Sequence, residues 1–383
     1  YQTTASRGTM FVRRLIGTVP VEEDGSAYFV TPAYRDISFN ALDADGKTLK
    51  RMGSTTQVMP GEIHGCVGCH EHRESSPPVR MTRPLALRRG PSMPQRPDWG
   101  TNGIIDFVKV VQPILDQHCV ECHGGPQPDG LLDLSGDKTA YFNMAYNQLV
   151  DRDWVQYLGP AAVGHGETST RALGSPISRI CRYFESDHYD VKVTDQQRRT
   201  IYTWIDANIP YYGTYEYTDG HVMGARDRWY VHDKDKWFQK DFLPVFYRRC
   251  QKCHERPVED IHIYNFNPGG AVIVTSSTWP DSALNQFQFG YGRPNYLAQI
   301  GPAHRINLTH PEWSLMLTAP LSKSAGGLGL CQPKEGLPRP FADKNDPDYQ
   351  AMLRALHRGH ERLFANPRVD MLAESADKDK HDE

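Results

Sequence analysis

The sequence of 383 residues lacks any apolar run near the roughly 18–20 residues that a membrane-spanning helix needs. It also lacks an excess of either charge, since 43 Lys and Arg residues stand against 46 Asp and Glu residues. Nothing in this balance indicates nucleic acid or an anionic membrane as a partner. The sequence contains no glycine-rich phosphate loop, no nucleophile elbow and no paired-histidine zinc helix. It therefore gives no support for the nucleotide-binding, hydrolase and zinc-protease classes that these motifs define.

What remains is an ordinary globular composition, with 39% hydrophobic and 23% charged residues. The length predicts two or three domains and is ample for a buried core. The chain begins at Tyr1 without Met, which predicts a processed or partial chain.

Cysteine is scarce, with eight residues, yet six of them form three copies of the pattern C-x-x-C-H. The copies are CVGCH (Cys66–His70), CVECH (Cys119–His123) and CQKCH (Cys250–His254). This pattern attaches c-type haem: two thiols bond the porphyrin vinyl groups, and the adjacent histidine becomes an axial ligand of the iron. We therefore predict three covalently attached haem c groups. They are held by Cys66, Cys69, Cys119, Cys122, Cys250 and Cys253, with His70, His123 and His254 as iron ligands.

Two other readings of the motifs are weaker. A zinc ribbon needs two C-x-x-C pairs about 15–20 residues apart, whereas the first cysteines here are 53 and 131 residues apart. A thioredoxin-like pair does not require the histidine that follows all three copies.

Covalent haem attachment takes place outside the cytoplasm, which predicts a periplasmic, extracellular or equivalent compartment. There Cys181 and Cys331 either form a disulfide or stay as two buried thiols.

The predicted fold class is α+β, with a small N-terminal β module followed by two mainly α cytochrome c-like domains. Strands are expected over residues 11–19 and 26–30, and over 37–42 and 47–52, because an Asp-Gly pair between alternating runs predicts a hairpin. The predicted organisation is a β module with haem 1 (1–72), a linker (73–103), a domain with haem 2 (104–213), a connector (214–240), a domain with haem 3 (241–372) and a charged tail (373–383).

The second and third motifs are expected to share one local design. Apolar residues at helical spacing lead into each motif: Phe107, Val111 and Ile114 before the second, and Phe242, Val245 and Phe246 before the third. A closing helix is predicted over 194–209, with a capping box of Thr194 and Gln197, and another over 348–364.

Several phrases resemble the hydrazine synthase alpha subunit and its relatives. GTVPVEEDGSAYF (17–29), MPGE (59–62) and CVGCHE (66–71) resemble the middle domain of that subunit. INLTHPE (306–312), AGG (325–327) and DPDYQ (346–350) resemble its C-terminal haem domain. HYDVK (188–192) and YTWIDAN (202–208) are similar to a cytochrome c domain of planctomycete-type haem proteins.

The chain also departs from that family. The resemblance implies a β-propeller ahead of this region, which is absent, and two haem motifs, where this chain has three. It also implies a tyrosine ligand four residues beyond the first motif histidine, but Glu74 occupies that position. Hydrazine-forming activity is therefore not carried over.

The second axial ligand of each iron separates the functional hypotheses. His188 is the candidate for haem 2 and His310 for haem 3, with Met371 as the alternative there. For haem 1 the choice among His64, His72 and His118 stays open, as does an open or Glu74-ligated site.

The first hypothesis is a triheme c-type cytochrome that acts in electron transfer, whose partners are other redox proteins or haem subunits in a homo- or hetero-oligomer. The second is a redox enzyme of the hydrazine synthase type, with haem 1 as a site for a small nitrogen compound. The third is a haem-bearing structural subunit of a larger complex or filament. The sequence leaves enzymatic activity undecided.

Overall fold

The computed structural model describes residues 13–52, 55–66, 68, 83–100, 103–139, 142–152, 154–156, 169–213, 218–219, 222–223, 241–251, 262–265, 272–275, 305–333, 335–336 and 340–372. Its helices there are α1 (Gln112–His118), α2 (Met144–Asp151), α3 (Arg179–Tyr183), α4 (Asp195–Asp206), α6 (Leu243–Phe246), α10 (Leu315–Thr318) and α11 (Pro347–Ala365). One π-helical turn, Phe107–Val111, precedes α1, and another, Tyr247–Gln251, follows α6.

The described strands form three antiparallel pairs: β1 (Asn40–Leu42) with β2 (Thr48–Arg51), β3 (Thr218–Asp219) with β4 (Val222–Met223), and β5 (His262–Asn265) with β6 (Val272–Thr275). Short 3-10 helices occur as well, at Leu85–Arg88, Asp129–Leu131, Ser175–Ile177, Pro311–Trp313, Lys323–Ala325 and Val369–Met371. Helices and small sheets occur together, which confirms the α+β class. The cytochrome c-like character of the helical parts stays a prediction. No helix in the described part of the chain is long and apolar enough to cross a membrane.

The chain folds into two compact units, each assembled from separate stretches of sequence. Unit N comprises Phe11–Val111 and Asp153–Thr214, and unit C comprises Tyr1–Met10, Gln112–Arg152 and Tyr215–Glu383. The domain boundaries predicted from the sequence follow chain order and stay predictions.

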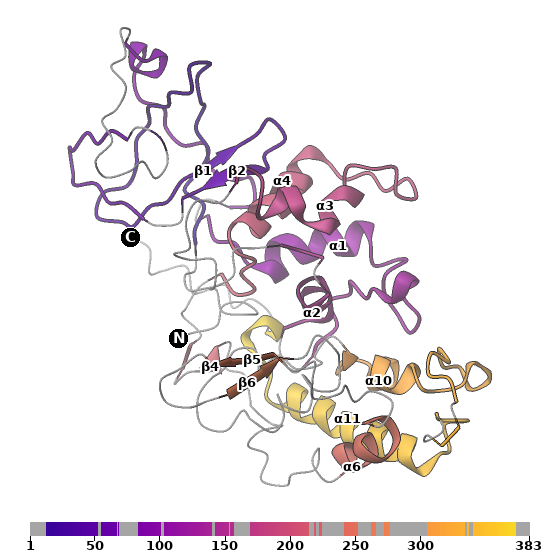
Figure 1. Ribbon diagram of the computed structural model, residues 1–383. Coiled ribbons are helices and arrows are strands. Elements are labelled where there is room, and N and C mark those ends of the chain that lie inside the picture. The colour runs from indigo at the N-terminus through magenta and orange to yellow at the C-terminus, as the bar shows by residue number, and fades with distance from the viewer. Residues whose placement is uncertain are drawn as a thin grey trace. The chain divides into compact units, whose positions relative to one another are not determined.

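The second predicted hairpin in unit N is confirmed. β1 and β2 pair with Asn40 opposite Arg51, and the turn between them is closed by the Asp43 carboxyl, which accepts hydrogen bonds from the backbone N–H groups of Asp45 and Lys47. The side chain of Asp206, at the end of α4, accepts from the backbone of Thr48, so β2 is tied to the helix (Figure 1).

The first predicted hairpin forms only its turn, where the Glu22 N–H donates to the Ser26 carbonyl at 2.8 Å. Among the described residues, 13–19 and 26–30 form no β-bridge with each other. Thr18 instead bridges Gln95, and Phe29 bridges Ser92. Both partners come from the second half of the stretch predicted as a linker. The hairpin prediction was wrong because pairing here is set by tertiary contacts and not by the local turn signal.

The predicted closing helix of unit N is confirmed as α4. Thr194 caps it, and the reciprocal capping box with Gln197 is present. Trp204 of α4 is fully buried, with its ring 5.1 Å from that of Phe107, which lies on the other side 5.9 Å from Tyr211. The helix therefore packs against the turn that leads toward the second motif.

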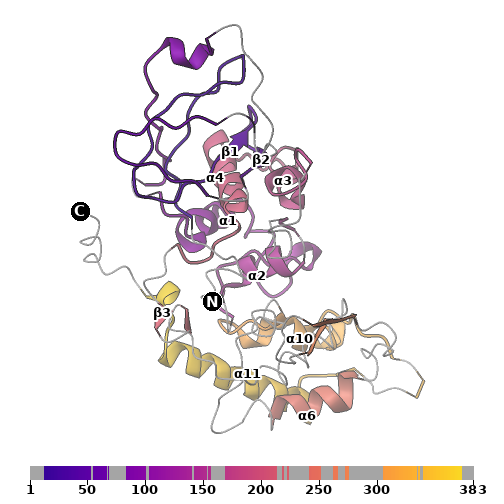
Figure 2. The same cartoon turned by 60° about the vertical axis from the view of Figure 1, so that its left-hand side comes forward.

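The second closing helix, in unit C, is confirmed as α11. Its buried face includes Tyr349, Met352, Leu356 and Leu363. α6 lies beside it, as Figure 1 shows, and α10 also contacts it (Figure 2). This arrangement repeats that of unit N, because a helix leading into a C-x-x-C-H motif packs against a helix that follows much later in the chain.

The C-terminal end of unit C is anchored by a buried arginine. Arg368 is 1% exposed and donates to the carbonyls of Thr139 at 2.6 Å and Phe142 at 2.8 Å. Its guanidinium also pairs with Asp370. The segment after α11 is thereby fixed to the chain that follows the second motif.

Candidate haem-binding site

The second motif begins where α1 ends. Ile114 and Leu115 are buried on α1. The Leu115 carbonyl accepts from the Cys119 N–H, and the Cys119 carbonyl accepts from the N–H groups of Cys122 and His123. The motif is therefore a tight turn that continues the helix. Cys119 is half-buried, and Cys122 is exposed.

The His123 ring has a defined hydrogen-bond partner. Its Nδ1 lies 3.0 Å from the carbonyl oxygen of Asp129, which can only accept, so Nδ1 carries the proton. Nε2 then carries the lone pair that binds a metal, which is the second-shell arrangement typical of ligating histidines. The backbone is also held, because the Leu134 N–H donates to the His123 carbonyl at 2.7 Å. Two thiols and an imidazole in this tautomer fit the donor set of haem c.

The thiols do not resemble a reactive redox pair. Burial, followed by the charge of Asp116, raises the pKa of Cys119 to about 11. Redox-active C-x-x-C pairs work with a lowered thiol pKa. Cys119 therefore stays protonated at neutral pH, which disfavours the thioredoxin-like reading of this motif.

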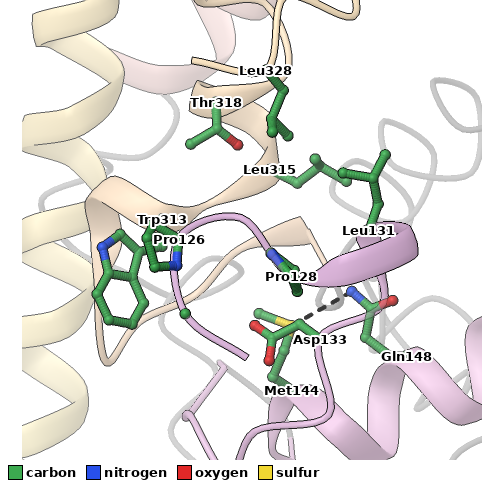
Figure 3. A pocket seen from close by; sticks show the side chains of 11 residues that line it. Pro126, Pro128, Leu131, Asp133, Met144, Gln148, Trp313, Leu315, Thr318 and Leu328 are labelled. Carbon is green, nitrogen blue, oxygen red and sulfur yellow. Dashed lines mark hydrogen bonds between the residues drawn. The ribbon is translucent and has the colours of Figure 1, made fainter. Parts of the chain in front are cut away.

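A pocket lies beside the loop that follows the second motif (Figure 3). Asp133 lines it, is 8% exposed, and accepts a 2.9 Å hydrogen bond on Oδ1 from the Ser135 N–H. Burial raises the pKa of Asp133 to about 6 despite this hydrogen bond. The lining consists of Gly125, Pro126, Pro128, Leu131, Asp133, Met144, Gln148, Trp313, Leu315, Thr318 and Leu328.

Unit C places His310 near this pocket. The His310 ring stacks on Trp313 with centroids 3.8 Å apart, and its backbone N–H donates to Asn307. Asn307 in turn donates to Asp137 at 2.6 Å, and the Lys138 N–H donates to the Thr309 hydroxyl at 2.6 Å. The fold thereby brings the predicted ligand of haem 3 beside the chain that follows the second motif.

The third motif is described up to its first cysteine and the residue after it. Cys250 is half-buried at the end of the π-helical turn that follows α6. Arg249 pairs with Asp346 at 2.5 Å, and Arg248 pairs with Asp348, so the turn is held against the start of α11. Cys253 and His254 lie outside the described residues.

The first motif is described in part. Cys66 is exposed and follows a turn in which the Glu62 N–H donates to the Met59 carbonyl at 3.1 Å. His64 is exposed, with Nδ1 3.8 Å from a carboxyl oxygen of Glu62. Cys69, His70, His72 and Glu74 lie outside the described residues.

The other predicted ligands are placed without being assigned to an iron. His118 is the half-buried last residue of α1. His188 belongs to unit N, between α3 and α4, with its ring edge-on to Tyr183 and Tyr189 at 4.9 Å each. Met371 is half-buried in the segment that Arg368 anchors. Their roles as ligands stay predictions.

Cys181 belongs to unit N and Cys331 to unit C, and the choice between a disulfide and two buried thiols stays a prediction. Cys181 is fully buried and Cys331 is half-buried. Within the described ranges, no group of three or more His, Cys, Asp or Glu side chains is arranged to hold a metal ion.

Sequence reasoning missed His360 and Asp133. His360 lies on α11, and its Nδ1 donates to the Leu308 carbonyl at 2.6 Å. Its spacing of four residues from the buried Leu356 could have indicated a position at the edge of the helix core. Asp133 carries no sequence signal, because the pocket that it lines is completed by residues 313–328, far along the chain.

The comparison with protein families gives one match. The family model of the hydrazine synthase alpha subunit middle domain matches residues 2–71, a stretch that includes the first C-x-x-C-H motif. This match confirms the resemblance predicted for the N-terminal sequence. No curated protein and no solved structure matches the chain.

Proposed function

We propose that this chain, related through residues 2–71 to the hydrazine synthase alpha subunit family, is a three-haem c-type cytochrome that transfers electrons. Each C-x-x-C-H motif would attach one haem through its two cysteines, with its histidine as an axial ligand. Haem iron supplies a one-electron redox centre when it is bound.

The observation that carries the proposal is the geometry at His123. The helix end presents two thiols, and the Asp129 carbonyl fixes the ring in the tautomer whose Nε2 can bind iron. This is the arrangement in which ligating histidines are typically held. The repeated packing of a motif-leading segment against a later helix, Phe107 on Trp204 and α6 on α11, is a second support.

The electron-transfer role follows from the proposed axial ligands. We assign His188 to haem 2 and His310 to haem 3, and for haem 1 we favour a local histidine, His64 or His118. Irons with two histidine ligands have no open position for substrate, whereas outer-sphere electron transfer needs none. The proposed covalent haems imply a location in the periplasm, outside the cell or in an equivalent compartment. Its partners would then be other redox proteins or haem subunits of an oligomer.

Mass spectrometry of the denatured chain tests the haem content. Three haem additions are expected for the unaltered protein and two for the variant Cys119→Ser/Cys122→Ser. Cys181→Ser is the matched control and should retain three, because Cys181 lies outside every motif. Fewer than three additions in the unaltered protein would remove at least one motif from the proposal.

A redox enzyme is the alternative, and one observation favours it. The match to the hydrazine synthase alpha subunit middle domain spans the first motif, so haem 1 is the candidate site for a small nitrogen compound. Carbon monoxide added to the reduced protein separates the two functions. Electron transfer alone predicts that no haem binds it, whereas binding at the haem on Cys66 and Cys69 would replace our proposal with the enzyme.

The family name describes hydrazine synthase alpha as a subunit, which favours assembly with other chains as a further possibility. A haem-bearing structural subunit would show a defined oligomer without rapid electron exchange. Native mass spectrometry together with stopped-flow reduction by a small donor distinguishes that role from electron transfer.

A further inference from the structure

We propose that Trp313 is the coupling residue through which an electron passes between the second and the third haem. This role rests on the proposed function, in which His123 binds the iron of haem 2 and His310 that of haem 3. Trp313 lies outside every C-x-x-C-H motif, yet it would set how fast the two haems exchange an electron. All three residues belong to unit C.

The first step is the contact between Trp313 and His310. Their rings stack with centroids 3.8 Å apart and an interplanar angle of 23°. The backbone holds this stack, because the Trp313 N–H donates to the His310 carbonyl at 2.9 Å and the His310 N–H donates to Asn307 at 2.8 Å. In the part of the chain that the structure describes, neither ring nitrogen of His310 has a hydrogen-bond partner. The imidazole can therefore bind iron at its edge while its face stays on the indole.

The second step is the pocket that Trp313 shares with the loop after the second motif. Trp313, Pro126 and Pro128 line this pocket together, as Figure 3 shows. Its volume is about 30 Å³, which leaves room for no more than about two waters. The gap between the indole and the loop is therefore small, and water can bridge it.

The third step is the link from this loop to the second motif. The Asp129 carbonyl accepts from Nδ1 of His123 at 3.0 Å, and a peptide bond joins Asp129 to Pro128. Nε2 of His123 is then the atom that would bind the iron of haem 2. The route from one iron ligand to the other consists of one hydrogen bond, one peptide, the small pocket and one ring stack.

A second route through unit C is longer. It runs from the His123 carbonyl to the Leu134 N–H at 2.7 Å, along the backbone to Lys138, and from the Lys138 N–H to the Thr309 hydroxyl at 2.6 Å. This route crosses the saturated backbone of residues 134–138, whereas the first route ends in two delocalised rings in contact. Coupling between redox centres weakens with each added bond and gap, so the route through Trp313 is favoured.

The step itself is a plain electron exchange. One electron leaves a ferrous centre and reduces a ferric centre, no bond forms or breaks, and no proton moves. The indole of Trp313 stays neutral and is not oxidised, so the exchange needs no further oxidant or reductant.

Flash photolysis of the haem-loaded protein tests the proposal. A photoexcited ruthenium complex injects one electron into the fully oxidised protein, and transient absorption follows its exchange among the haems. Trp313→Leu should slow the exchange between haems 2 and 3 several-fold. Trp313→Phe keeps a ring and should give a rate between those of Trp313→Leu and the unaltered protein. Midpoint potentials and low-spin spectra should stay unchanged, whereas a merely structural role of Trp313 would alter them.

Three further variants serve as controls. Leu328→Ala changes the same pocket without removing a ring, and Thr309→Val removes the hydroxyl of the second route. Both should keep the rate of the unaltered protein. Cys119→Ser/Cys122→Ser lacks haem 2, so the kinetic phase assigned to this exchange should disappear.

An unchanged rate in Trp313→Leu, equal rates in Trp313→Phe and Trp313→Leu, or equal slowing in Thr309→Val would overturn the inference. If Trp313→Leu makes a haem high spin, Trp313→Met, which fills more of the volume without a ring, takes its place and the same outcomes apply. A high-spin haem in both variants would assign Trp313 a structural role and overturn the inference as well. A haem count below three by mass spectrometry would instead refute the proposed function.

Discussion

Replacing Arg368 by methionine should destabilise unit C more than any exposed ion-pair variant. Arg368 is 1% exposed, and its guanidinium bonds the Thr139 carbonyl, the Phe142 carbonyl and the Asp370 carboxyl. Methionine fills a similar volume and cannot donate. The change therefore tests the hydrogen bonds and the charge, and leaves the packing largely intact.

The magnitude follows from what the substitution leaves behind. Asp370 has a side chain only 2% exposed, and a second cation, the Lys138 ammonium, lies 3.9 Å from it. Removing one partner of a buried ion pair costs about 3–5 kcal/mol. Each orphaned carbonyl adds up to about 1–3 kcal/mol, reduced where water enters. We expect a loss of about 4 kcal/mol in the free energy of unfolding.

Denaturant unfolding of the haem-loaded protein measures this loss. Arg358→Met is the matched control, since Arg358 pairs with Asp241 at 2.7 Å but its side chain is 52% exposed, and it should cost less than about 1 kcal/mol. The double variant Arg368→Met/Asp370→Asn should recover part of the loss, because it no longer buries a carboxylate that has lost its guanidinium partner. A cost below about 1 kcal/mol for Arg368→Met, or no recovery in the double variant, would refute this account of the anchor.

Two further predictions concern unit N. Burial raises the pKa of Asp106 from 3.8 to about 6, so the folded state binds the proton more tightly than the unfolded chain. The contribution of Asp106 to the free energy of unfolding is complete below pH 3.8 and is lost as the pH rises through 6, by up to about 3 kcal/mol. Asp106→Asn should flatten this part of the curve of stability against pH. An unchanged slope of melting temperature against pH in thermal melts would contradict the assignment. Gly103→Ala should lower the free energy of unfolding by at least about 2 kcal/mol in denaturant unfolding. The reason is that Gly103 has φ +65° and an added Cβ would lie 2.0 Å from the Leu15 carbonyl oxygen. Gly25→Ala is the control that isolates the clash, because Gly25 also has a positive φ but an added Cβ would meet no atom within 4 Å.

The features that the sequence predicted correctly are those set by neighbouring residues. The capping box of Thr194 and Gln197 starts α4 because both partners lie within one turn. The apolar spacing of α11 and the Asp45-Gly46 turn before β2 are local in the same sense. The family resemblance near the first motif depended on contiguous phrases, and the match over residues 2–71 confirms it.

The features that sequence reasoning missed depend on residues far apart. Thr18 pairs with Gln95 and not with the strand across its own turn, because the better partner is supplied by the folded module. The carbonyl that orients His123 comes from Asp129, a residue with no special sequence character. Arg368 lacks any pattern that would mark a charged side chain as 1% exposed.

The division of unit C into separate stretches imposes an order on its biogenesis. The Lys138 N–H bonds to the Thr309 hydroxyl across 171 residues, so this contact has to wait until the later stretch is synthesised. At about 5–20 residues per second, that wait lasts roughly 10–30 s. Throughout this interval the loop after the second C-x-x-C-H turn lacks the pocket wall that Trp313 supplies. The pocket beside residues 125–133 can therefore form only after residues 313–328 have been synthesised.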